Sequence, residues 1–259
     1  MRAAIWSELL KARRSRVPWV TVLAFTVAAL VGGLFMFVLQ DQRRARSLGL
    51  LGAKANLAGA EADWQTYFSF LAQTTAVGGM LVFGLVLTWT FGREFGQRTI
   101  TDLLAIPTGR VAIVSAKFVV GGIWCLLLAA QIALLGLVIG LVLGLPGWSA
   151  AAAVAGLAKL FATAAMTFLL VTPVAFAASA GRGYLPGVGV IMSAIFLAQV
   201  VAALGYGHYF PWSVPALYSG LAGTERTPPG LVGFVLVAVV GLAGAAVTGV
   251  WWRNADHDR

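Results

Sequence analysis

The sequence predicts an all-α membrane protein with six transmembrane helices and an N-terminal interfacial amphipathic helix. Of its 259 residues, 60% are hydrophobic and only 10% are charged, whereas an average soluble domain carries about 25% charged residues. Six continuous apolar runs each reach the roughly 20 helical residues that cross a hydrocarbon core about 30 Å thick. Membrane-spanning strands would instead appear as alternating segments of about 10 residues.

The six runs lie close together along the chain, so we expect a single transmembrane domain over residues 1–259. The runs are Val17–Leu39, Tyr67–Phe91, Phe118–Leu143, Ala152–Ala178, Leu185–Leu204 and Leu231–Trp252. The segment Tyr206–Gly230, between the last two runs, is rich in aromatic residues and proline. Aromatic rings favour the headgroup level, which predicts a segment that rests in the outer interface.

The stretch Met1–Arg16 precedes the first run and has an amphipathic pattern. One helical stripe carries Ile5, Trp6, Leu9 and Leu10, while Ser7, Glu8, Lys11, Arg13 and Arg14 point elsewhere. This pattern favours a helix in the inner membrane interface. The alternative is an ordinary positive flank that only sets the topology.

The basic residues predict that both termini are cytoplasmic, because Lys and Arg concentrate on that side. With the N-terminus inside, the inner segments hold twelve basic residues and the outer segments hold five. The outer ones are Arg43, Arg44, Arg46, Lys54 and Arg226. Lys159 lies early in the fourth run, where its amine can reach the outer headgroups. The net charge of +9 therefore indicates a membrane surface as partner, and no nucleic acid.

Few polar residues interrupt the runs. Gln73, Gln131 and Gln199 lie within the second, third and fifth runs, either lining a substrate path or forming interhelical hydrogen bonds. Gly136, Gly140 and Gly144 recur every four residues and predict close approach of another helix. The histidines, His208 and His257, have no Cys, Asp or Glu at ligand spacing within a span, so we expect no metal site and no catalytic residues.

The segment Gly92–Lys117 is the longest charged stretch on the predicted inner side. Ile100, Leu103 and Leu104 share one helical face, and Pro107 with Gly109 then ends that helix. Such a short amphipathic helix suits docking into the groove of a partner protein. The alternative is a plain connector whose apolar face rests on lipid.

The wording of this segment is similar to that of a known family. Glu94, Arg98-Thr99, Leu103-Leu104, Pro107, Arg110 and Lys117 resemble the signature that follows the second span in ABC-2 type transporter permeases. The resemblance is strongest to the bacitracin, lantibiotic-immunity and sodium-export branch, because Arg98 stands where the commoner wording has a glycine. It also implies that Tyr206–Gly230 is a re-entrant-like segment before the last helix.

The resemblance implies a partner and its contact residues. In that family two permease chains pair with two ATPase chains, and the helix between spans two and three presses into a cleft of the ATPase. The positions that take this coupling role here are Glu94, Arg98, Thr99, Asp102, Leu103, Leu104, Pro107 and Arg110. The sequence contains no G-x-x-x-x-G-K-[ST] phosphate loop, so ATP and Mg²⁺ are expected on the partner ATPase and no cofactor in this chain.

These observations predict the permease subunit of an ATP-driven exporter in a bacterial plasma membrane, acting as a homodimer. The near absence of charge in the spans favours an amphipathic or hydrophobic substrate, such as a peptide antibiotic, a drug or a lipid-like molecule. Sodium export is one alternative, although an ion path usually gathers carboxylates or several oxygen ligands at membrane depth. A non-transporting membrane anchor or sensor that recruits a soluble partner is the other.

Overall fold

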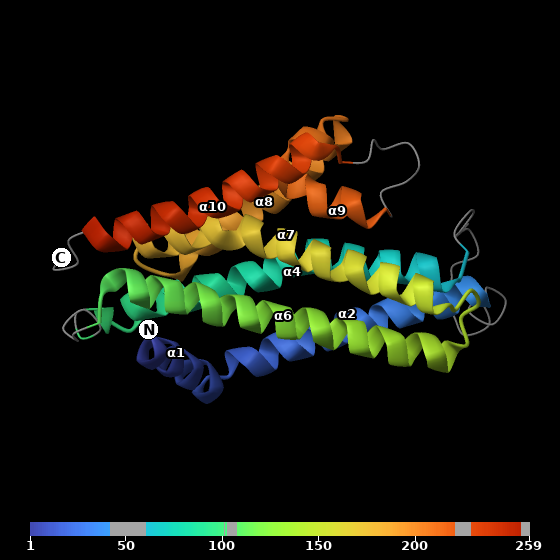
Figure 1. The fold of residues 1–259 in the computed structure, drawn as a ribbon, viewed down its shortest axis with the longest axis horizontal. Helices are drawn as coiled ribbons and strands as arrows, with labels where there is room; N and C mark the ends of the chain where they lie inside the picture. The colour runs from blue at the N-terminus through green and yellow to red at the C-terminus, as the bar shows by residue number, and fades with distance from the viewer. Residues whose placement is uncertain (42–60, 101, 103–107, 221–228, 255–259) are drawn as a thin grey trace.

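The computed structural model describes residues 1–41, 61–100, 102, 108–220 and 229–254, which form a bundle of long helices (Figure 1). Six of these helices are long and apolar enough to cross a membrane. They are α2 (Val17–Gln40), α4 (Trp64–Gly96), α6 (Arg110–Leu143), α7 (Ala150–Ala180), α8 (Tyr184–Ala203) and α10 (Leu231–Asn254). This finding confirms the predicted fold class of six spanning helices.

Two of the helices extend well beyond their apolar runs. α4 begins at Trp64, where the Asp63 side chain accepts a hydrogen bond from the backbone amide of Thr66, and it continues to Gly96. α6 begins at Arg110, about two turns before the predicted apolar run. Hydropathy marks only the lipid-facing length of a helix, whereas backbone hydrogen bonding continues into the polar region. The long helices therefore carry charged residues at one end of the bundle.

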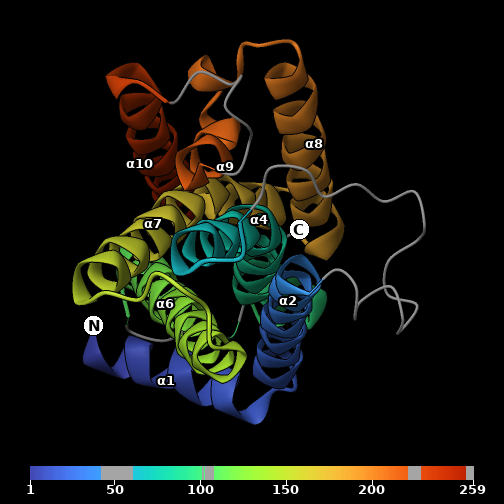
Figure 2. The ribbon, with the colours of Figure 1, turned by 90° about the vertical axis from the view of Figure 1, so that its right-hand side faces the viewer.

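Helix α4 occupies the middle of the bundle, in contact with α2, α6, α7 and α8 (Figure 2). Its side chains Tyr67, Leu71, Phe83 and Phe91 are fully buried. α10 packs mainly against α7, and α2 packs against α6. Much of the remaining surface of the spanning helices exposes large apolar side chains, which is the surface that lipid or another subunit covers.

The three glycines that recur every four residues at the C-terminal end of α6 have two different roles. A Cβ at Gly136 would contact Leu71, and one at Gly140 would contact Trp64, so both glycines let α6 approach α4 closely. Gly144 instead has φ 61° as the C-cap of α6, a left-handed conformation that favours glycine. The predicted close packing therefore applies to the first two glycines, whereas Gly144 ends the helix.

The segment between α8 and α10 turns back into the bundle, as the predicted re-entrant-like element requires. It forms two 3₁₀ turns, η1 (Gly207–Tyr209) and η2 (Pro211–Ser213), and the short helix α9 (Val214–Ser219), which packs against α4 and α7. The indole nitrogen of Trp212 donates to the carbonyl of Leu170 at 3.1 Å. The hydroxyl of Ser213 donates to the carbonyl of Ala198 at 3.1 Å.

The N-terminal helix α1 (Arg2–Arg14) lies across the end of the bundle that also carries the C-terminal end of α10 (Figure 1). We call this end the termini end. α1 packs against α6, and its buried residues Ala4, Glu8 and Ala12 are spaced by four. Trp6 is 65% exposed on the other side of the helix. The placement of that apolar side in a membrane interface stays a prediction.

Candidate functional site

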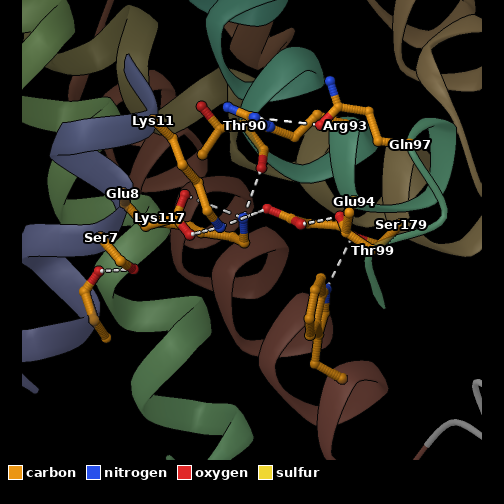
Figure 3. Close-up of polar contacts among 12 residues, drawn as sticks. Ser7, Glu8, Lys11, Thr90, Arg93, Glu94, Gln97, Thr99, Lys117 and Ser179 are labelled. Carbon is orange, nitrogen blue, oxygen red and sulfur yellow. Dashed lines mark hydrogen bonds and ion pairs between the residues drawn. The ribbon is translucent and has the colours of Figure 1, made fainter. Parts of the chain in front are cut away.

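Four charged side chains from three helices meet at the termini end and form what we call the buried ion cluster: Glu8 and Lys11 of α1, Glu94 of α4 and Lys117 of α6 (Figure 3). The Nζ atom of Lys11 lies 2.7 Å from Glu8 Oε1 and 2.8 Å from Glu94 Oε1. The Nζ atom of Lys117 lies 3.2 Å from Glu8 Oε2 and 3.1 Å from Glu94 Oε1. Two acids and two bases make the cluster neutral.

Lys117 is the most deeply buried member of the cluster, with 0% of its side chain exposed. Its ammonium donates to Glu8, to Glu94 and, at 2.9 Å, to the backbone carbonyl of Thr90. These acceptors match the three donors of an ammonium group. A buried charge is tolerated only when it is paired and hydrogen-bonded, so the cluster depends on all of its members.

Lys11 is the most exposed member, at 25% of its side chain. Burial disfavours its ammonium form, but the nearby carboxylates of Glu8 and Glu94 outweigh this effect and raise the pKa of Lys11. Lys11 therefore stays charged around neutral pH, and α1 stays paired to α4.

Glu94 also fastens the start of the segment that joins α4 to α6. Its Oε2 atom accepts a hydrogen bond of 2.7 Å from the Thr99 hydroxyl, and its carbonyl accepts one of 2.9 Å from the Thr99 amide. Arg98, which lies between Glu94 and Thr99 in the sequence, has φ 57°. This conformation costs a residue with a Cβ roughly 1–2 kcal/mol. The commoner form of the signature has a glycine at the position of Arg98. A glycine adopts this φ without that cost, so Arg98 is strained where the commoner residue is not.

Arg110 fastens the other end of the same segment. Its Nη1 atom donates to the carbonyls of Trp252 and Arg253, at 3.4 and 3.3 Å, and these carbonyls lie in the last turn of α10, where helical partners are missing. Trp252 is fully buried, and its Nε1 atom donates to the Ser179 hydroxyl of α7 at 2.9 Å. The joining segment is thus anchored to α1, α4 and α6 at one end and to α10 at the other.

The predicted coupling residues fall into different environments. Glu94 is buried at 2% exposure, whereas Arg98 and Asp102 are exposed. Leu103, Leu104 and Pro107 lie outside the described residues. The assignment of this set to an ATPase contact stays a prediction, and the Glu94 carboxylate is paired within this chain.

Sequence reasoning gave no site role to Glu8 and Lys11, and it included Lys117 in the family-like signature without assigning it a role. A signal for the first two was available, because Glu8 and Lys11 share their side of α1 with the small residues Ala4 and Ala12. Small neighbours indicate a face that packs against protein. The signal for Lys117 was its position next to Ala116 and Phe118 at the start of an apolar run.

A cavity of about 80 Å³ lies farther along the bundle, between α4, α8 and the turn into α9. Gln73 and Gln199 both line this cavity, together with Met80, Trp212 and Ser213. The Ser219 hydroxyl donates a short hydrogen bond to Gln73 Oε1. Two of the three glutamines predicted for a substrate path are therefore brought together.

The third glutamine, Gln131, lies elsewhere and joins α6 to α2. Its Nε2 atom donates to the carbonyl of Val22 at 2.9 Å and to the Thr26 hydroxyl at 2.8 Å. This is the interhelical hydrogen bonding that was the alternative interpretation for all three. Among the described residues, no group of three or more His, Cys, Asp or Glu side chains could hold a metal ion.

Comparison with known proteins adds two findings. The sequence model of a family described as ABC-2 family transporter protein matches residues 4–199. The bacitracin transport permease protein of Bacillus licheniformis is 28% identical over 179 residues, which cover 69% of this chain and 85% of that protein. The range matched by the family contains the whole buried ion cluster and both glutamines of the cavity.

Proposed function

Because the chain belongs to the ABC-2 family of transporter permeases, we propose that it is the membrane subunit of an ATP-driven exporter for an amphipathic or hydrophobic substrate. Membership of this family and six apolar helices make it a multi-pass membrane transport subunit. The separate ATPase, the export direction and the substrate class belong to the proposal.

The observation that carries the coupling part of the proposal is the anchoring of the segment between α4 and α6 at both ends. Thr99 is bonded to Glu94, which pairs with Lys11 and Lys117, and Arg110 is bonded to the end of α10. A partner that pushes on this segment therefore moves helices rather than a free loop. Leu103 and Leu104 are the proposed apolar contacts with the ATPase, and the exposed Arg98 and Asp102 precede them in the sequence.

The proposed assembly contains two copies of the permease and two ATPase chains, with ATP and Mg²⁺ on the ATPase. Both termini and the buried ion cluster lie on the cytoplasmic side in this arrangement. The sequence lacks a phosphate loop, which supports a separate ATPase. The cavity of Gln73 and Gln199 lies toward the opposite side and serves as part of the substrate path.

The cavity and the relative support the proposed substrate class. The cavity is lined by alanine, aliphatic and aromatic side chains with two amides and one serine, and its lining has no carboxylate. Apolar walls with a few polar groups are typical of small-molecule sites, and a cavity of about 80 Å³ would hold only a small part of such a substrate. The relative's name ties it to bacitracin transport, and we extend a peptide-antibiotic substrate to this chain. Sodium export is the competing proposal.

The test uses cells that produce the permease together with the P-loop ATPase that copurifies with it. These cells are expected to survive a membrane-active peptide at higher concentrations than control cells, and to show unchanged sodium tolerance. The matched control carries the ATPase with its phosphate-loop lysine replaced, which should remove the protection. Protection against sodium alone would refute the amphipathic substrate and keep the transporter.

A second measurement separates a transporter from a membrane anchor or sensor. The purified permease alone is expected to bind no ATP at micromolar concentrations, and its reconstitution with the ATPase is expected to stimulate ATP hydrolysis. Stable association without any stimulation or transport would favour the anchor.

A further inference from the structure

Lys159 of α7 is a charged residue within a spanning helix and has no acidic partner among the described residues, since none of their carboxylate oxygens lies within 4 Å of its Nζ atom. It lies at the end of the bundle opposite the termini end. Its Nζ atom is 3.4 Å from the Ser69 hydroxyl and 3.4 Å from the carbonyl of Ser219. Both distances exceed the 2.7–3.2 Å of a good N–H···O hydrogen bond, so the ammonium has unused donor capacity.

The position of Lys159 along α7 places its amine near a headgroup boundary. α7 has 31 residues and is roughly 46 Å long, which exceeds a hydrocarbon core of about 30 Å by roughly 8 Å at each end. Lys159 follows the first residue of α7 by about 14 Å, and its Cα atom therefore lies roughly 6 Å inside the boundary. A lysine side chain can span that depth.

A groove of about 350 Å³ opens beside this amine, between α4 and α7. Its polar lining residues are Gln65, Ser69 and Lys159, and its remaining walls include Phe68 and the small residues Ala155 and Gly156. Gly156 packs directly on the ring of Phe68, and the small side chains of Ala151, Ala152 and Ala155 form the α7 side of the groove. The groove therefore combines apolar walls with an ammonium, a hydroxyl and an amide.

We propose that this groove binds one phospholipid by its phosphate group, with Lys159 as the charged contact and Ser69 and Gln65 as hydrogen-bond donors. A phosphate supplies several acceptor oxygens to a cation that has too few. The apolar walls suit the glycerol and the first acyl carbons of the same molecule. A free phosphate ion would have to lose its water to reach this depth, whereas the phosphate of a lipid already lies at the boundary.

The site is separate from the substrate cavity, because no lining residue is shared between the two. Ser219 lies between them, with its carbonyl toward Lys159 and its hydroxyl on Gln73. The proposal therefore does not depend on the substrate assigned above.

The experiment measures lipid retained by the purified full chain in native mass spectrometry, after delipidation and addition of one lipid at a time. Phosphatidylglycerol is expected to be retained, and a diacylglycerol with the same acyl chains is not. Lys159→Gln should reduce retention roughly tenfold, as expected for the loss of one hydrogen bond to a charged group, and Lys159→Arg should preserve it.

Two exposed alanines of α7 provide a matched pair that leaves the charge unchanged. Ala155 lines the groove and Ala158 does not, so Ala155→Phe should block retention and Ala158→Phe should not. Arg13→Gln, which removes an exposed charge at the termini end, should leave the retained lipid unchanged. Equal retention by Lys159→Gln and the unaltered chain would overturn the proposal, as would equal binding of diacylglycerol or displacement of the lipid by inorganic phosphate.

Discussion

Lys117 of α6 and Glu94 of α4 form an ion pair of 3.1 Å inside the bundle, although they lie on either side of the segment that joins the two helices. The same Glu94 oxygen accepts from Lys11 of α1 at 2.8 Å. One carboxylate thus ties the N-terminal helix to both helices that flank the proposed coupling segment. A displacement of this segment must move α1 or break a buried ion pair.

Replacement of Lys117 by Met should strongly destabilise the permease, because Glu8 and Glu94 then share only Lys11. Loss of one partner from a buried ion pair costs about 3–5 kcal/mol, which should appear as a lower midpoint of thermal unfolding in detergent. Arg13→Met removes an exposed cation and should change the stability by less than about 0.5 kcal/mol. Equal stability of Lys117→Met and Arg13→Met would show that the cluster contributes nothing.

Glu94→Gln should uncouple transport without detaching the ATPase, because the carboxylate is buried and holds Thr99 rather than a partner. We expect ATPase copurification per folded permease to stay unchanged and transport to fall roughly 2- to 30-fold. Glu61→Gln, at an exposed acid near the opposite end of α4, is the control.

Replacement of both Leu103 and Leu104 by Asp should have the contrasting effect, since charge placed in an apolar contact is costly. Here the ATPase should fail to copurify while the permease stays folded. Normal copurification and transport for this double variant would show that the segment is a plain connector and not an ATPase contact.

Arg98→Gly should stabilise the permease. The left-handed φ of Arg98 costs a residue with a Cβ roughly 1–2 kcal/mol, which the substitution removes. The greater freedom of glycine in the unfolded chain reduces this gain by about 0.4–1 kcal/mol. A net gain of about 0.5–1 kcal/mol should raise the unfolding midpoint. Arg16→Gly, at a residue with φ −85°, should give no gain, and a loss of stability at Arg98 would indicate that its side chain has contacts of its own.

The sequence was sufficient to predict the six spans because lipid leaves the backbone few options. A long apolar run must satisfy its hydrogen bonds within itself, so length and hydropathy define the helix. The same reasoning placed the start of the third span at Phe118, whereas α6 begins at Arg110. Beyond the hydrocarbon core, hydropathy no longer reports whether a helix continues.

The candidate site could be predicted only in part, because its contacts join residues far apart in the chain. Glu94 and Arg110 were selected from the wording of one segment, but nothing in that segment indicates pairing with Glu8 or Lys11 of α1. The meeting of Gln73 with Gln199 likewise depends on how α8 and α9 pack on α4. Local patterns report local structure, and the partners of a buried charge depend on the tertiary fold.

Gln73 and Gln131 should respond differently to replacement by Leu, because one lines the cavity and the other joins two helices. Gln73→Leu should alter the level or the range of resistance to membrane-active peptides with little change in the unfolding midpoint. Gln131→Leu should cost roughly 1 kcal/mol of stability and leave the range of substrates unchanged. Identical effects on resistance for the two variants would remove the cavity from the substrate path.

The orientation of the chain can be tested with single cysteines in a Cys125→Ala background, since Cys125 is buried and is the sole cysteine. Cysteines at Ala53 and Gly223 should react with an impermeant thiol reagent in intact cells, and one at Thr108 should react only after the cells are opened. This pattern follows from the excess of basic residues on the predicted inner side. Arg43, Arg44 and Arg46 in the first outer loop favour the opposite orientation. The reverse pattern would place both termini outside, and the buried ion cluster would then lie on the side where no ATP is available to a coupled ATPase.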